Sequence, residues 1–168
     1  LGKNIILLRK PIYTTGDRIK IEFFPEGGHL LTNTIQRIVY RATDPFGNPA
    51  NISGDVEDPQ NNVVGAGKIM KNGFGLISLM PMPNQTYSFN VKSEYGNGQK
   101  FRMPEAILNG SSISLVRTEQ DAFRMAIHNT GSKVGKKLTV AAVAAGKVKM
   151  EFDVMAKPKN NLNILTTN

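Results

Sequence analysis

The chain has 168 residues, enough for one large domain or two small ones, and its 40% hydrophobic and 20% charged content is typical of a globular rather than a disordered protein. It has no cysteine, which excludes disulfides, thiolate metal sites, cysteine nucleophiles and internal thioesters within this segment, and no apolar run approaches the roughly 20 residues that span a bilayer. The net charge of +8 divides evenly at Pro104, with 12 basic and 8 acidic residues up to it and 9 and 5 after it, so we expect no nucleic-acid-binding surface and no direct membrane insertion by this segment.

The first hundred residues alternate between apolar and polar side chains with period two, which predicts half-buried β-strands. The stretch TYSFNVK, for example, places its tyrosine, phenylalanine and valine on one face. Turn sequences separate the strands: DPFGNP at residues 44–49, DPQNN at 58–62 and NG at 72–73. The predicted strands cover residues 18–24, 36–43, 52–58, 63–70, 73–80 and 86–92.

The same alternation resumes after a break near Met103 and Pro104, since proline cannot donate to a strand ladder. In KVKMEFDV, at residues 147–154, we expect the valines, the methionine and the phenylalanine to face inward. The predicted strands of this part cover residues 112–117, 122–129, 138–144 and 147–154. The closing run NILTTN resembles a strand without a following partner, so we expect an exposed edge there, for which pairing with another copy of the chain is one remedy.

The organisation that follows is an all-β chain of two tandem β-sandwich units. We expect residues 17–104 to form the first unit and residues 105–168 a second unit that is incomplete, because a two-sheet sandwich usually needs about seven strands over roughly 100 residues. Residues 1–16 are expected to be a linker or a strand from a preceding region, because the chain opens without an initiator Met or a signal-peptide pattern.

Few residues suggest a catalytic, metal-binding or phosphate-binding role. The two histidines, His29 and His128, would need further ligands to hold a metal, and the acids Asp55, Glu57 and Asp58 lack the dense spacing of dedicated calcium loops. There is no G-x-S-x-G elbow, and GAGKIM at residues 65–70 lacks the full phosphate-loop pattern, so its small residues indicate close strand approach. We therefore expect no enzyme activity, no cofactor and no metal site.

Three exposed apolar residues are the candidates for contact with a partner. Phe46 is placed at a predicted hairpin tip between Pro45 and Gly47, and hairpin tips carry recognition in many sandwiches. Packing on its own loop or on a neighbouring domain is the alternative for Phe46. Met80 and Met82 flank Pro81 and are candidates for a surface between domains.

The stretch FFPEGG combines two aromatics with a proline, an acid and a glycine pair. Successive strand residues point to opposite faces, so only one of the two aromatics can enter a given core. We expect the proline to end strand pairing, the glycines to supply the unusual φ values of a corner, and the acid to accept backbone N–H bonds across it. A structural role is therefore predicted for Phe23, Phe24, Pro25, Glu26, Gly27 and Gly28.

Three motifs in this order resemble a macroglobulin-type (MG2-like) β-sandwich domain of bacterial alpha-2-macroglobulin-related and TonB-receptor-associated envelope proteins. They are IEFFPEGGHLL at residues 21–31, TDPFGNPA at 43–50, and GFGLISLMP at 73–81 followed by Tyr87. The resemblance covers roughly residues 18–102, and it departs from the family pattern at Asn61, where glycine is usual. Residues from Ser112 onward resemble the start of a second such domain more loosely.

The resemblance implies an immunoglobulin-like antiparallel sandwich, repeated along a long extracytoplasmic protein of the periplasm or outer membrane, without catalytic residues. It implies a non-catalytic structural spacer whose partners are the neighbouring domains of the same polypeptide. A module that binds a glycan, a peptide or another protein is the alternative, and part of a protease-trapping macroglobulin is a more distant one. The thioester of such traps contains a cysteine, which this segment lacks.

Overall fold

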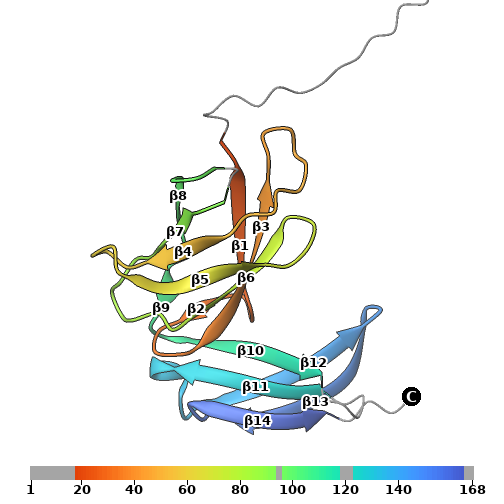
Figure 1. The fold of residues 1–168 in the computed structure, drawn as a ribbon. Helices are drawn as coiled ribbons and strands as arrows, with labels where there is room; N and C mark the ends of the chain where they lie inside the picture. Colours follow the sequence, from red (N-terminus) through yellow and green to blue (C-terminus); the bar gives the residue numbers. More distant parts are fainter. Residues whose placement is uncertain (1–17, 94–95, 118–122, 165–168) are drawn as a thin grey trace, which may run out of the picture.

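The computed structural model describes residues 18–93, 96–117 and 123–164, which form an almost entirely β structure (Figure 1). The expected linker at residues 1–16 lies outside the described residues. Among the residues that are described, no helix is long and apolar enough to span a bilayer. The antiparallel, immunoglobulin-like all-β fold expected from the sequence is confirmed. We call residues 18–107 the first region and residues 110–164 the second region.

The first region is built on one seven-stranded antiparallel sheet with the order β1-β3-β6-β5-β4-β7-β8, which curls until its two ends face each other across a core (Figure 1). Phe89 on β7 lies edge-on to Phe23 on β1, with ring centroids 6.1 Å apart, and is 5.1 Å from the ring of Tyr40 on β3. The seven strands are β1 (Lys20–Pro25), β3 (Gln36–Thr43), β4 (Gly54–Glu57), β5 (Val63–Ile69), β6 (Phe74–Leu79), β7 (Ser88–Val91) and β8 (Lys100–Arg102).

Glycines make room for this aromatic core. A side chain on Gly75 would overlap the ring of Tyr40, and one on Gly67 would lie 2.6 Å from the ring of Phe89. Both glycines of GAGKIM lie in strand β5, Gly67 against the rings of Phe89 and Tyr40 and Gly65 against the carbonyl of Ser78 and the side chain of Val56, as close strand approach predicted. The hydroxyl of Tyr40 donates to the carbonyl of Ile52 at 2.7 Å, and burial raises the pKa of Tyr40 to about 12.

The FFPEGG stretch forms the corner after β1, with one correction to its predicted geometry. Phe23 packs against the core while Phe24 is 50% exposed, as expected for neighbours on a strand. Pro25, however, does not end the pairing: it lies opposite Ile38, and the N–H of Glu26 still donates to the carbonyl of Arg37. Proline is tolerated because β1 is an edge strand, where its missing N–H breaks no ladder bond.

A short parallel pair lies in the first region, next to its connection to the second. Strand β2 (Leu30–Leu31) lies beside β9 (Ala106–Ile107), so the chain that leaves the corner pairs with the segment that enters the second region. Both leucines of β2 are buried. Gly110, at the start of β10, lies against the side chains of Leu31 and Ile107, and a Cβ there would approach each to 2.7 Å.

The second region is a smaller two-layer structure that follows a short connection from β9 (Figure 1). A three-stranded sheet with the order β10-β11-β14 packs on the hairpin β12–β13 through Met125, Ile127 and Val140, which are buried. The strands are β10 (Gly110–Arg117), β11 (Phe123–Thr130), β12 (Lys137–Ala144), β13 (Lys147–Met155) and β14 (Lys159–Ile164), with a 3-10 turn at Gly131–Lys133 between β11 and β12.

Two expectations for the second region require correction. Phe152 and Val154 face the core, but Val148 is 58% exposed, because the register shifts at a bulge beside Val143 as the hairpin leaves the core. The strand expected at NILTTN begins earlier, at Lys159, and is paired with β11, while residues 165–168 of that stretch lie outside the described residues. Its other side forms the edge of the three-stranded sheet among the described residues.

Candidate functional site

The most specific contact between the two regions is made by Glu26 of the corner and Arg37 of β3. The guanidinium donates two bonds to the carboxylate, from Nε to Oε2 at 2.8 Å and from Nη2 to Oε1 at 2.6 Å. Both groups also reach β10: Arg37 donates to the carbonyl of Leu115 at 3.2 Å, and Glu26 accepts the N–H of Leu115 at 3.3 Å. The bond to Arg37 lowers the pKa of Glu26, which stays ionised at neutral pH.

These bonds cover a strand edge. Strand β10 is paired only with β11 in the described sheet, so the peptide groups of Leu115 that point away from β11 would otherwise be open to another strand. The acid of the corner was expected to bond backbone N–H groups of its own turn. Instead Glu26 binds a strand that lies 89 positions further along the chain.

Gly27 lets the corner approach this edge closely. A Cβ at this position would lie 2.5 Å from the backbone nitrogen of Ile113 and 2.8 Å from its carbonyl oxygen, which is closer than real Cβ atoms come. Its φ of +80° also lies in the left-handed region, as the sequence predicted for the glycine pair. Gly28 has a φ of +91°, and a Cβ there would meet no atom within 4 Å, so its role is the turn alone.

Gln36 holds the backbone of the corner through hydrogen bonds of its side-chain amide. Its side-chain amide is buried, donates to the carbonyl of His29 at 2.8 Å and accepts the N–H of Leu31. A second, longer bond of 3.4 Å joins the same amide nitrogen to the carbonyl of Glu26. One side chain of β3 therefore holds both ends of the turn that carries Glu26 and Gly27.

A cavity of about 130 Å³ remains beside this contact, between the corner and the face of the three-stranded sheet. His128 lines it from β11, directly opposite Ser112 of β10 in the strand register. Burial lowers the pKa of His128, the nearby Lys159 lowers it further, and Glu26 acts in the opposite direction. The cavity is lined by Glu26, Ile35, Gln36, Arg37, Ser112, Ser114, Val116 and His128.

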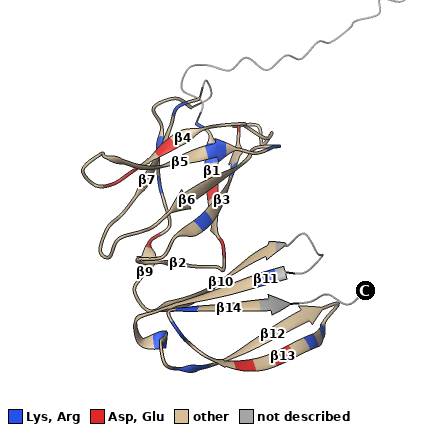
Figure 2. Ribbon diagram, turned by 60° about the horizontal axis from the view of Figure 1, so that its bottom comes forward, with Lys and Arg blue, Asp and Glu red and all other residues tan. Residues whose placement is uncertain are grey.

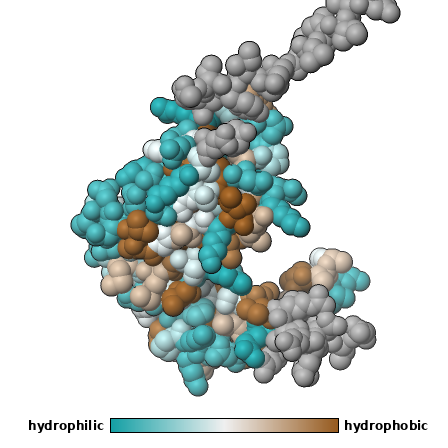
Figure 3. All heavy atoms as spheres, in the orientation of Figure 1, coloured by the Kyte–Doolittle hydropathy of each residue, from teal (hydrophilic) through white to brown (hydrophobic). Residues whose placement is uncertain are grey.

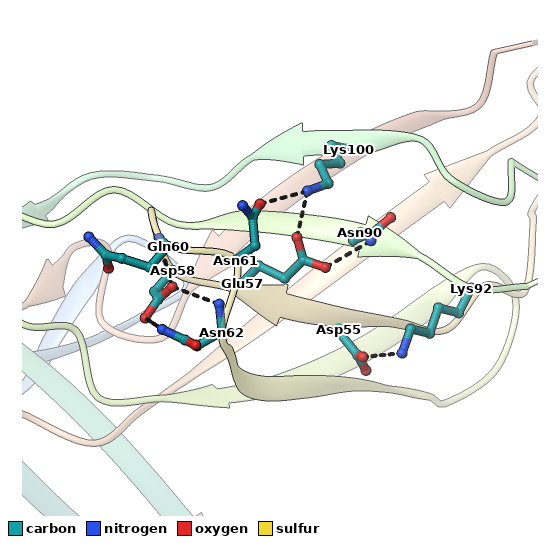
Figure 4. Close-up of polar contacts among 9 residues, drawn as sticks. All are labelled: Asp55, Glu57, Asp58, Gln60, Asn61, Asn62, Asn90, Lys92 and Lys100. Atoms are coloured by element: carbon teal, nitrogen blue, oxygen red, sulfur yellow. Dashed lines mark hydrogen bonds and ion pairs between the residues drawn. The ribbon is translucent and has the colours of Figure 1, made fainter.

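The acidic group near β4 is engaged by basic and amide side chains rather than left open (Figure 4). Glu57 accepts a bond from Asn90 at 2.8 Å and one from Lys100 at 2.7 Å, and these contacts lower its pKa. Asp55 forms an ion pair with Lys92, the residue that follows β7. Within the described residues, no three acidic or histidine side chains are grouped so as to hold a metal.

Asp58 begins a loop in which its own carboxylate accepts bonds from the residues that follow it. Its Oδ1 accepts the N–H groups of Gln60 and Asn62 at 2.9 and 2.8 Å, and its Oδ2 accepts the side-chain amide of Asn62 at 2.9 Å. Asn61 takes a left-handed φ of 64° at the position where the resemblance leads one to expect glycine, and its side chain accepts a bond from Lys100. The departure from the family pattern therefore keeps the turn and adds a contact.

The loop that carries Phe46 repeats this arrangement. Asp44 accepts the N–H groups of Phe46 and Asn48 at 2.9 and 2.8 Å and the side-chain amide of Asn48 at 3.0 Å, while Gly47 takes the left-handed position. Both loops share the pattern Asp-Pro-x-(Gly/Asn)-Asn. The side chain of Phe46 is 59% exposed on this self-bonded loop.

The three candidate contact residues do not form one surface. Strands β3 and β6 are antiparallel with Gln36 opposite Leu79, so Met80 lies at the end of the sheet where β3 begins, whereas Phe46 lies beyond the end of β3. Met80 and Met82 are 48% and 45% exposed, beside the segment in which Asn33 donates to the carbonyl of Pro81. Phe46 and the methionine pair are therefore separate candidate contacts.

Basic charge is less evenly placed in the fold than along the chain. The first region carries nine basic and eight acidic residues, a net charge of +1, and the second carries nine and four, a net charge of +5. The acids of the second region that are described, Glu151 and Asp153, both lie on β13 (Figure 2). Dividing the chain at Pro104 hides this difference, because that division adds the charges of residues 1–17 to the first part and the negative charge of Glu105 to the second.

Sequence reasoning pointed to the corner but missed the groups it binds. Arg37, Gln36 and Leu115 were seen only as members of alternating strands, where a polar residue at every second position is ordinary. The buried, polar Gln36 within an otherwise apolar face of β3 was the one local signal available.

Comparison with known proteins adds no assignment: no family model matches the chain, and no curated protein is significantly similar to it.

Proposed function

We propose that this chain is a non-catalytic structural and interaction module, a spacer of two joined β-sandwich units within a larger bacterial cell-envelope protein. The observation that supports this proposal most is the Glu26–Arg37 pair, which binds both the N–H and the carbonyl of Leu115 in the second region. A spacer must hold one unit in a fixed orientation relative to the next. A charged pair that bonds a strand edge of the other unit resists rotation between the two.

The macroglobulin-type assignment and the extracytoplasmic location are part of the same proposal, and the sequence motifs at residues 21–31, 43–50 and 73–81 support them. The partners proposed on this basis are the neighbouring domains of the same polypeptide. No nucleic acid and no catalytic role are proposed.

Backbone ¹⁵N relaxation tests the spacer role. We expect both regions of the unaltered protein to share one rotational diffusion tensor, and the double variant Glu26→Gln/Arg37→Gln to tumble as two partly independent bodies. Lys20→Gln is the matched control, because it removes an exposed ion pair with Glu22 on the same strand β1 without touching the junction. Independent tumbling in the unaltered protein, or turnover of any hydrolase substrate by the purified chain, would contradict the proposal.

A ligand-binding module is the second candidate, and the loop of Phe46 favours it. An aromatic ring that is 59% exposed on a loop fixed by Asp44 is presented in a constant position, which limits the entropy lost on binding. Glycan and peptide arrays probed with the unaltered chain and with Phe46→Ala separate the two candidates. Binding that disappears in Phe46→Ala would support a ligand-binding module, and no binding on either array would leave the spacer role alone.

A further inference from the structure

The end of the β12–β13 hairpin differs in its chemistry from the other turns of the molecule. Ala145 and Gly146 have φ values of 50° and 73°, the pattern of a type I′ turn, which favours asparagine, aspartate or glycine at its first position. The other residues with positive φ in the described chain that are not glycine are all asparagine: Asn33, Asn61, Asn72 and Asn84. Ala145 therefore keeps an unfavourable Cβ at a position where asparagine is used elsewhere in this protein.

Apolar side chains are exposed beside this turn. Val143 and Val148 are direct partners in the hairpin register, and they are 63% and 58% exposed. Ala144 and Ala145 between them are exposed as well. In Figure 3 apolar colours gather at this end of the hairpin, which stands clear of the first region. The tip, residues 143–149, thus presents methyl groups where a solvated turn would present polar ones.

The same tip also contains basic side chains. Lys147 and Lys149 are exposed, and the sequence contains no acidic residue from Val140 to Met150. The loops at Asp44 and Asp58 differ from this tip, because each contains a carboxylate that accepts bonds from the N–H groups of its own turn. The tip therefore combines an apolar end with a positive rim.

We propose that residues 143–149 dock on an anionic lipid surface, with the valine and alanine side chains entering the boundary between headgroups and acyl chains. The lysine stems are long enough to lie along apolar surface while their ammonium groups stay at the level of lipid phosphates. The net charge of +5 on the second region attracts it to such a surface at longer range. This contact is peripheral, so it adds a lipid partner to a segment for which the sequence predicted no insertion across a membrane.

Charge complementarity favours lipid over a second copy of the chain. A neighbouring copy would bring its own positively charged second region to the tip, and like charges would oppose the contact. The acids that could offset this repulsion in the described second region are Glu151 and Asp153, and the latter already pairs with Lys137 at 2.7 Å.

The test is flotation of the full chain with vesicles of phosphatidylcholine alone and of phosphatidylcholine mixed with phosphatidylglycerol. We expect binding to the anionic vesicles that weakens as salt is added. At about 1 kcal/mol for each lysine near an anionic surface, or about fivefold, Lys147→Gln/Lys149→Gln should weaken binding by about 25-fold. Val143→Ser/Val148→Ser should weaken it as well.

Two further variants keep the proposal falsifiable. Ala145→Asn should raise the melting temperature of the second region, because it relieves the strained turn, and yet weaken vesicle binding. Val63→Ser/Val64→Ser is the matched control, since these valines are also exposed, at 58% and 45%, but lie on β5 of the first region, and binding should not change. The proposal is wrong if anionic vesicles do not bind at low salt, or if the tip variants bind as well as the control. Self-association that the valine variant abolishes would assign the tip to a second copy instead.

Discussion

The two regions of the molecule reach stability by different means. The first closes a seven-stranded sheet around Tyr40 and Phe89, which are both fully buried. Among the described residues of the second region, the core cluster contains three buried side chains, and on β10 Ile113 and Leu115 remain 38% and 48% exposed, although the register places them on the same face as the buried Ile127. A covering layer of two strands is too narrow to bury the whole face of three.

The junction is therefore part of the second region's stability. The edge strand β10 is covered by the corner at Glu26 and Gly27, which belongs to the first region. We expect the first region to fold without the second, and the second to lose protection when the junction is weakened. The predictions that follow test this asymmetry, in decreasing order of their expected effect.

Truncation of the aromatic core should have the largest effect. Phe89→Ala removes a ring that is 0% exposed, and we expect a loss of about 3–5 kcal/mol in the unfolding free energy of the first region, because the rigid strands around it cannot close the cavity. Phe152→Ala in the partly buried core of the second region should lose less. Region-resolved hydrogen exchange measures both, and equal losses would remove the basis for the comparison.

Substitutions in the glycine pair of the corner separate the effect of close backbone contact from the effect of turn geometry. Gly27→Ala should destabilise the second region by about 2–3 kcal/mol, because its Cβ would overlap the backbone of Ile113 in addition to straining a φ of +80°. Gly28→Ala, with a φ of +91° and no neighbour within 4 Å, should lose only about 1 kcal/mol. The measurement is hydrogen exchange of β10 and β11, and similar effects of the two substitutions would show that close approach at Gly27 is unimportant.

The junction should also respond to pH. Burial holds the pKa of His128 below its ordinary 6.5, so the unfolded chain binds a proton more readily, and the unfolding free energy of the second region should fall as the pH drops below about 6.5. The stabilisation from Glu26, whose pKa is lowered from 4.5, is present above that pH and is lost only in more acidic solution.

His128→Gln tests the pH dependence that is assigned to His128. In this variant the decline that begins at about pH 6.5 should flatten, while the decline in more acidic solution remains. Denaturant titrations of both proteins at a series of pH values measure the difference. A decline of the same slope in the variant would assign the pH dependence to other groups.

The smallest effect is expected in the loop at Asp58. Asn61→Gly keeps the left-handed φ of 64° and loses only the exposed contact with Lys100, so the first region should lose a few tenths of a kcal/mol. Asn61→Ala, which keeps a Cβ without the side-chain amide, should lose about 1 kcal/mol. Thermal unfolding of the two variants gives this order, and a larger loss in Asn61→Gly would show that the contact with Lys100 matters more than the turn.

Much of the fold was predictable because alternating strands carry their own signal. The strand predicted at residues 36–43 agrees with β3, and that at 138–144 differs from β12 by one residue. Strands β2 and β9 were missed because two residues are too few to form a pattern. The start of β14 was missed because its asparagine-rich sequence has little strand propensity and is held by pairing with β11.

The candidate site was predictable only in part, for a related reason. The φ values at Gly27 and Gly28 follow from local chemistry and were anticipated. The contact from Glu26 to Leu115 joins residues 89 positions apart, and nothing in either local sequence specifies the other. The exposure of Val148 likewise depends on a bulge, which a regular alternation cannot reveal.

The twin loops at Asp44 and Asp58 bear on how the surface of this protein could change. In each, the residue after proline, Phe46 or Gln60, is bonded to the aspartate through its backbone N–H. Because these bonds use the backbone, they do not depend on which side chain the position carries. The first region thus has two loops of the same backbone pattern in which the residue after proline can be exchanged while its bond to the aspartate is kept, and grafting phenylalanine into the second, as Gln60→Phe, should leave the backbone of that loop unchanged.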